Sequence, residues 1–141
     1  MSVKSGRLIK GHPYIDVLIS PDGKSSTKFT ALIDTGFSGF LSVPVMTGSL
    51  LGLKAHTTAR YELADGKTSD PFPLAYGYAC LEDDPPFVQG LITLSAHTST
   101  VVGVDFLLRC GKVMLLFSKG VVMVSEADIL AALKTAGESK P

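Results

Sequence analysis

The 141-residue chain has 13 lysines and arginines against 13 aspartates and glutamates, and 45% of its residues are hydrophobic. This length provides one domain with a core of its own and is too short for two, so we expect residues 1–141 to form a single domain. The balanced charge, with no basic cluster between aromatic residues, argues against a nucleic-acid partner. No apolar stretch is long enough to cross a bilayer, so we expect a soluble protein with no membrane partner.

The sequence contains few groups that could hold a metal ion or form disulfides. Its two cysteines, Cys80 and Cys110, lie far apart among apolar residues, where inert packing is the expected role. Its three histidines are isolated from one another, so no spacing typical of a zinc site occurs, and we expect no metal and no cofactor. The first residues lack the apolar segment of a secretory signal, and together with the missing disulfide framework this indicates the cytoplasm.

Two strands are predicted near the start of the chain, at residues 14–20 and 28–34, because both segments are rich in β-branched and aromatic residues. The sequence PDGKSST between them carries an Asp-Gly turn signal. This region should therefore form an opening hairpin. The glycines of TGSLLGLK, residues 47–54, fit no phosphate-binding pattern, and we predict only a turn there.

A second Asp-Gly pair, Asp65-Gly66, lies between two further predicted strands at residues 58–63 and 67–78. Prolines interrupt the later strand. Asp-Gly between two strands favours a type I′ turn, in which both central residues have positive φ. We expect a second, exposed hairpin here.

The rest of the body is predicted as short strands and one helical turn. Strands are expected at residues 87–94 and 100–102, a helical turn at 105–109, and a further hairpin from 113–117 and 121–124. The body of the domain is therefore mainly β.

Only the end of the chain, about residues 125–137, has a clear helical pattern. Ser125 and Asp128 form a start similar to a capping box, and Gly137 suits the C-terminal stop. We predict a small closed or half-closed β-barrel over about residues 13–124, followed by this helix.

The tripeptide Asp34-Thr35-Gly36 directly follows an apolar strand. A carboxylate in an apolar run must be paired or hydrogen-bonded, because an isolated buried charge is costly. Gly36 would let backbone N–H groups approach the carboxylate oxygens, and the Thr35 hydroxyl could lock the loop. The same three residue types are also common in turns, so the tripeptide alone does not define a site.

Two motifs occur in order: LIDTG at residues 32–36 and VVGVDFLL at residues 101–108. Gly103 follows Asp34 by 69 positions, and at this spacing the motifs resemble the retropepsin-like (clan AA) aspartic proteases, in particular the single-lobed bacterial branch. The resemblance covers most of the chain and implies a β-barrel of the acid-protease type with a short helix after the second motif. It also implies that Gly103 lies where two backbones come close, a demand that only glycine meets.

The same resemblance assigns roles to individual residues. Asp34 would be catalytic, and the residues that would support its loop are Thr35, Gly36, Ser38 and Gly103. The hairpin at residues 61–69 would be the flap that closes over substrate. Its tip residues, together with Phe37, would contact the substrate: Ala64, Asp65 and Gly66.

The chain also departs from the family pattern. Phe37 stands where relatives carry a small residue, so it should reshape the pocket beside Asp34. Retroviral relatives pair an acidic residue with an arginine at the positions that here hold Ser38 and Val104, so that inner salt bridge is absent. The flap tip has the single glycine Gly66, beside charged neighbours. In these features the chain resembles the bacterial branch of the family.

Peptide hydrolysis by this route needs two carboxyl groups, one ionised and one protonated. The chain has one Asp-Thr-Gly, and its other aspartates are better explained as surface residues or helix caps. A two-fold homodimer would place Asp34 beside its own copy. The resemblance therefore implies a homodimeric aspartic endopeptidase that acts on peptide or protein substrates. The alternative is a non-catalytic retropepsin-like domain that dimerises or binds an extended peptide.

Overall fold

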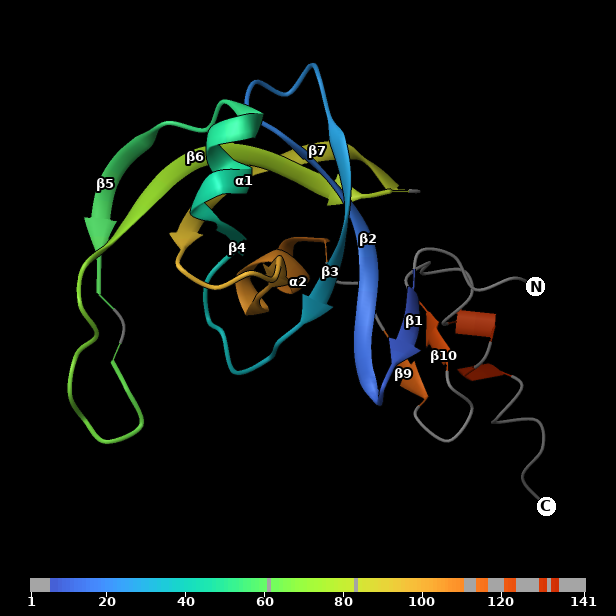
Figure 1. Cartoon of the computed structure of the whole chain (residues 1–141). Coiled ribbons are helices and arrows are strands. Elements are labelled where there is room, and N and C mark those ends of the chain that lie inside the picture. Colours follow the sequence, from blue (N-terminus) through green and yellow to red (C-terminus); the bar gives the residue numbers. More distant parts are fainter. Residues whose placement is uncertain are drawn as a thin grey trace.

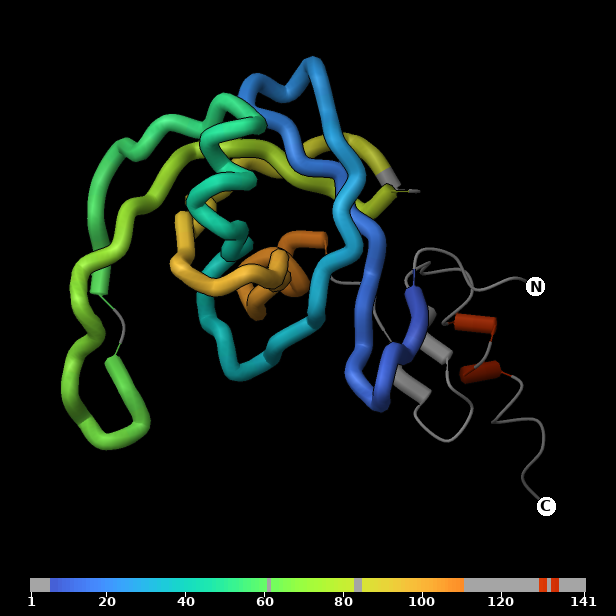
Figure 2. The backbone as a smooth tube through the Cα atoms, viewed as in Figure 1, coloured from blue at the N-terminus to red at the C-terminus, as the bar shows by residue number. Residues whose placement is uncertain are grey.

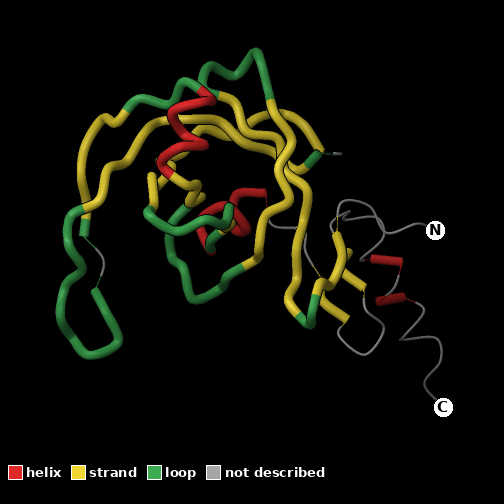
Figure 3. The backbone as a smooth tube through the Cα atoms, viewed as in Figure 1, coloured by secondary structure: helices red, strands yellow, loops and turns green. Residues whose placement is uncertain are grey.

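The structure is a computed structural model, and it describes residues 6–60, 62–82, 84–110, 114–116, 121–123, 130–131 and 133–134. Strands dominate it, and over residues 6–110 two short helices, α1 and α2, interrupt them (Figures 1 and 3). The elements in chain order are β1 (Gly6–Ile9), β2 (His12–Ser20), β3 (Thr27–Ile33), β4 (Leu41–Pro44), α1 (Val45–Leu51), β5 (Ala55–Ala59), β6 (Phe72–Leu81), β7 (Asp84–Ser95), β8 (Val101–Val102), α2 (Val104–Cys110), β9 (Met114–Leu116) and β10 (Val121–Met123).

One sheet curls into a ring. Its strand order is β1-β2-β3-β8-β4-β7-β6-β5, and β2 also pairs with β6. That extra pairing closes a ring of six strands, while β1 and β5 extend it on the outside (Figure 1). A closed ring leaves few free strand edges, which protects the backbone hydrogen-bonding groups of a small sheet. The prediction of a mainly β, barrel-like domain is confirmed.

The core fills the inside of this ring. Along β2, the alternate residues Ile15, Val17 and Ile19 are completely buried, as the two-residue period of a strand requires. The ring of Phe106, from α2, lies edge-on to Phe40 with 5.5 Å between centroids, and Phe106 is also completely buried. The helix α2 is therefore anchored to the barrel by its aromatic side chain.

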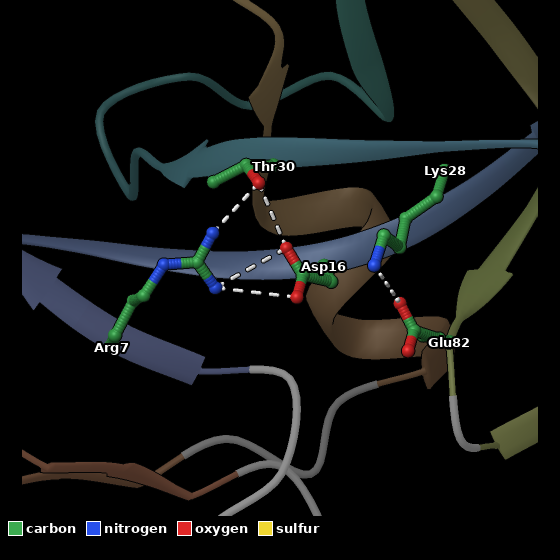
Figure 4. Close-up of polar contacts among 5 residues, drawn as sticks. All are labelled: Arg7, Asp16, Lys28, Thr30 and Glu82. Carbon is green, nitrogen blue, oxygen red and sulfur yellow. Dashed lines mark hydrogen bonds and ion pairs between the residues drawn. The ribbon is translucent and has the colours of Figure 1, made fainter.

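The opening hairpin is confirmed, with β2 and β3 antiparallel. An additional strand, β1, pairs with β2 through a turn at Lys10-Gly11, where both residues have positive φ. The sequence analysis missed this strand. Figure 4 shows the polar network that joins the three strands, in which the Arg7 guanidinium binds the Asp16 carboxylate and the Thr30 hydroxyl. The same figure shows Lys28 Nζ lying 3.5 Å from Glu82 Oε2.

The second hairpin is also confirmed, with β5 and β6 antiparallel, and its connection extends away from the ring (Figure 2). The predicted type I′ turn at its tip is wrong, because Gly66 has a φ of 83° but Asp65 has no positive φ. Instead, the Gly66 N–H donates to the Leu63 carbonyl, and the Leu63 N–H donates to the Lys67 carbonyl. This is the pattern of a turn over residues 63–66 that ends on a left-handed glycine, the three-residue hairpin loop.

The helix α1 corrects the prediction of a simple turn at residues 47–54. Gly48 is buried within it, and Gly52 ends it in the left-handed conformation, with a φ of 84°. The Gly52 and Leu53 N–H groups donate to the last helical carbonyls, as in common glycine C-caps. The glycines therefore belong to a helix and its cap.

The later predictions agree with the structure where it describes the chain. The strands β7 and β8, the helix α2 and the β9–β10 hairpin all lie at their predicted places. The predicted helix at 125–137 lies mostly outside the described residues, although residues 130–131 and 133–134 are helical. Within the described part of the chain, no helix is both long enough and apolar enough to span a membrane.

Candidate active site

Asp34 lies at the point where β3 leaves the sheet. The preceding residues pair in parallel with β8, and the Asp34 N–H donates to the Val102 carbonyl at 3.0 Å. Ile33 is buried, whereas Asp34, Thr35 and Gly36 are exposed. The expectation that the carboxylate lies within a buried apolar run is therefore wrong for the single chain, because the strand ends one residue earlier.

The Asp34 carboxylate is held by its own loop. The Gly36 N–H donates to Asp34 Oδ1 at 2.9 Å, and the Phe37 N–H donates to the Asp34 carbonyl at 3.1 Å. A Cβ at Gly36 would lie 3.1 Å from Oδ1, so a side chain there would crowd the carboxylate. No residue within the described ranges donates to Oδ2. One oxygen is thus fixed while the other is available for chemistry.

The backbone of residues 103–105 forms hydrogen bonds with residues 37–40, which follow Asp34, and we call this set of contacts the clamp. The Val104 N–H donates to the Phe37 carbonyl at 2.8 Å, and the Gly103 N–H donates to the Phe40 carbonyl at 3.0 Å. A Cβ on Gly103 would overlap the Gly39 carbonyl oxygen and lie 2.6 Å from that of Phe37. The two backbones therefore do come close at Gly103, and only a residue without a side chain fits between them.

Arg109, at the end of α2, holds this helix against Phe40 and β7. Its guanidinium lies 4.6 Å above the Phe40 ring and donates to the Gln89 carbonyl at 2.6 Å. It also pairs with the Asp105 carboxylate, one helical turn earlier, at 2.9 Å. A charged group stacked on an aromatic ring and paired within a helix holds both elements in register. These contacts join α2 to β7 and to the residue that ends the Asp34 loop.

Asp34 opens onto a cleft of about 540 Å³. Phe37 lines this cleft beside it, as do Leu63, the first residue of the turn at the hairpin tip, and Phe72, the first residue of β6. Leu94 and Val101 add apolar surface from β7 and β8. A mostly apolar hollow with a few polar groups is the usual form of a ligand site. The volume suits several amino-acid side chains.

Solved structures were found that resemble the whole arrangement. The crystal structure of a retropepsin-like aspartic protease from Rickettsia conorii aligns with a TM-score of 0.54 and 20% identity, covering 83% of this chain and 84% of that chain. This chain has a retropepsin-like fold. The solution structure of simian foamy virus (mac) protease aligns with a TM-score of 0.47 and 16% identity, over 71% of this chain and 99% of that one. EIAV protease complexed with the inhibitor HBY-793 aligns with a TM-score of 0.49 and 16% identity, over 77% of this chain and 96% of that one.

No model of a known protein family and no curated protein sequence matches the chain. The likeness to the solved structures is therefore a likeness of fold alone. The roles of individual residues have to be inferred from their positions in this structure.

The retropepsin-like fold brings only some of the predicted site residues to the cleft. Phe37 lies beside Asp34, as expected from its position after Asp-Thr-Gly. Ser38 instead lines a separate cleft of about 570 Å³, together with Tyr76 and Arg109. The hairpin tip residues line neither cleft: Ala64, Asp65 and Gly66. The hairpin reaches the Asp34 cleft through Leu63, the residue before these three, and through residues 69–72 on its returning side.

Two residues with titratable side chains that the sequence analysis did not assign also line the Asp34 cleft. Asp70 comes from the returning arm of the β5–β6 hairpin, and His97 comes from the loop between β7 and β8. The His97 N–H donates to the Ser95 hydroxyl at 2.9 Å, which shapes that loop. The only sequence signal for His97 was its position just before the second motif. For Asp70 there was no such signal.

Proposed function

We propose that the protein is a homodimeric aspartic endopeptidase of the cytoplasm, with the Asp34 carboxyl groups of two chains forming one site. The observation that carries this proposal is the Asp34 carboxylate itself: one oxygen is held by Gly36, the other is open, and a cleft of about 540 Å³ begins beside it. The retropepsin-like fold, with Gly103 against the loop, supports the same assignment.

The chemistry requires the two carboxyls to differ in protonation. The ionised carboxylate takes a proton from a water molecule, whose oxygen attacks the peptide carbonyl carbon. The protonated carboxyl donates to the carbonyl oxygen, which stabilises the tetrahedral intermediate. The C–N bond then breaks as the nitrogen receives a proton, giving a carboxylic acid and an amine. No metal or cofactor takes part in this sequence.

Other residues would position these groups. Thr35 and Gly36 shape the loop, and Gly103 allows the clamp to form. An extended peptide would lie along the cleft, with its side chains against Phe37 and Phe72. The hairpin that carries Leu63 would close over the peptide and exclude water, as lids do in many enzymes.

The proposal can be tested with a diverse peptide mixture, read by mass spectrometry from acidic to neutral pH. The wild type should cleave peptides, and Asp34→Asn should not. An amide oxygen can still accept the Gly36 N–H, so this variant should fold. Asp22→Asn is a matched control, because Asp22 is also an exposed loop carboxylate that accepts backbone N–H groups, yet it lines neither cleft. Equal cleavage by wild type and Asp34→Asn, or cleavage by neither, would contradict the proposal.

A further inference from the structure

The charges around the Asp34 cleft are of one sign. Asp34 and Asp70 both line it, and none of the residues that line it is a lysine or an arginine. The remaining titratable side chain is that of His97. Histidine side chains are ordinarily neutral above about pH 7. At that pH the cleft combines mostly apolar walls with negative charge.

Asp70 is well placed to act on a ligand. It is exposed, and no side chain in the described part of the chain bonds its carboxylate. Its backbone, by contrast, is restrained, since the Ser69 hydroxyl donates to its carbonyl at 3.0 Å and Pro71 follows it. A residue before proline is confined to extended conformations. The main chain is thus fixed while the carboxylate remains free to bind.

We propose that Asp70 selects peptides that carry lysine or arginine at a position bound in the Asp34 cleft. This inference rests on the proposed function, because it names the class of peptide that the same site takes. The aliphatic stem of such a side chain would pack on the apolar walls near Phe72, and its charged end would meet the Asp70 carboxylate. A glutamate at the same position would be repelled by Asp70.

The test is a binding measurement that does not require cleavage. Fluorescent peptide pools, identical except for one fixed position that is lysine, norleucine or glutamate, are titrated by anisotropy at about pH 7.5, where histidine is ordinarily neutral. The protein is the full chain carrying Asp34→Asn. We expect the lysine pool to bind about two- to fivefold more tightly than the norleucine pool, the range of an exposed ion pair. The glutamate pool should bind more weakly than both.

Variants at Asp70 test whether the preference for lysine depends on this carboxylate. Adding Asp70→Asn should abolish the preference for lysine over norleucine, and Asp70→Lys should favour the glutamate pool instead. Glu62→Gln removes one negative charge from the same hairpin at a residue outside the cleft, and it should leave the lysine preference unchanged. A preference that survives Asp70→Asn would overturn the inference, as would the absence of a preference or of any binding.

The outcome is separable from that of the proposed function. If the wild type cleaves no peptide but the lysine preference depends on Asp70, the catalytic proposal fails and the inference holds for a peptide-binding cleft. If the wild type cleaves peptides without regard to lysine or arginine, catalysis stands and the role of Asp70 is refuted.

Discussion

The backbone nitrogen of Val104 lies 2.8 Å from the carbonyl oxygen of Phe37. The neighbouring N–H groups of Gly103 and Asp105 donate to Phe40 and Gly39 in the same way. Three successive N–H groups at the start of α2 thus hold the loop that follows Asp34. These backbone hydrogen bonds hold residues 37–40 in place, and the residues that donate them do not line the Asp34 cleft.

Replacement of Gly103 by alanine should destabilise the fold strongly. The new Cβ would overlap the Gly39 carbonyl oxygen and crowd that of Phe37, and backbone atoms held by hydrogen bonds cannot easily move aside. Overpacking typically costs about 1–3 kcal/mol, and we expect a value of about 2 kcal/mol or more here. Urea unfolding at one fixed protein concentration measures the loss.

Gly52→Ala provides the control for that experiment. A Cβ at Gly52 meets nothing within 4 Å, so its only cost is the left-handed backbone at φ 84°. Such strain is worth about 1–2 kcal/mol. A Gly103→Ala variant that is no less stable than Gly52→Ala would show that the close approach has been misjudged.

The hairpin over residues 62–68 should matter for turnover rather than for folding. Gly66→Pro removes the N–H that donates to Leu63 and forces a negative φ where the turn has 83°. Because the tip is exposed and lies outside the core, the domain should remain folded while peptide cleavage falls. Cleavage rates and circular dichroism, measured together, check both parts.

A proline variant in another turn serves as the control, because it distinguishes a specific effect on the flap from a general loss of structure. Gly11→Pro places the same defect at φ 80° in the β1–β2 turn, outside both clefts. It should leave cleavage close to the wild-type rate. If both proline variants lose activity equally, or if neither does, the hairpin is only a surface turn.

Asp22 gives the fold a dependence on acid. Hydrogen bonds from the backbone N–H groups of Lys24 and Ser25, and from the Ser20 hydroxyl, lower the pKa of Asp22 from 3.8 to about 2. A carboxyl whose pKa is lower in the folded state stabilises the fold above the unfolded pKa and loses this effect as the pH falls through the folded pKa. Its contribution should therefore be complete above about pH 4 and disappear towards pH 2.

Urea unfolding of wild type and Asp22→Asn at about pH 5 and pH 2 checks this window, which follows from the two pKa values. The wild type should lose more stability on acidification than the variant, because only the wild type has this carboxyl to protonate. Parallel losses in the two proteins would mean that the hydrogen bonds to Asp22 do not differ between folded and unfolded chains.

The parts of the fold that could be predicted carry their signals locally. The β2–β3 hairpin follows from runs of β-branched residues around an Asp-Gly turn. The close approach at Gly103 followed from a resemblance in two short motifs, and the structure places that glycine against the Gly39 carbonyl. Where a few adjacent residues determine the geometry, the sequence is sufficient.

The parts that were missed depend on distant contacts. In α1, poor helix formers such as Thr47 and Gly48 conceal the helix, which packs so closely on β7 that a Cβ at Gly48 would lie 2.6 Å from Leu94 Cδ2. The lining of the cleft by Asp70 and His97 likewise arises only when the β5–β6 hairpin and the β7–β8 loop meet the Asp34 loop. No local sequence pattern predicts such contacts between segments that are far apart in the chain.

The proposed mechanism also predicts how activity depends on pH. One carboxyl of the pair must be ionised and the other protonated, so cleavage should rise and then fall as the pH increases. The optimum should be acidic, since carboxyl groups ordinarily titrate near pH 4. Rates of cleavage across the acidic and neutral range, on a protein shown to stay folded throughout, test this. A flat profile would contradict a shared proton.

The central claim is that two Asp34 carboxyls from two chains form one site, and subunit mixing tests it most directly. Wild-type and Asp34→Asn chains are unfolded together in equal amounts and refolded, with dimers and their exchange confirmed by native mass spectrometry. If hybrids with one carboxylate and one amide are inactive, about a quarter of the activity of an all-wild-type sample should remain, by random pairing at a symmetric interface. A residual of about half, the value for independent sites under the same pairing, would contradict the account.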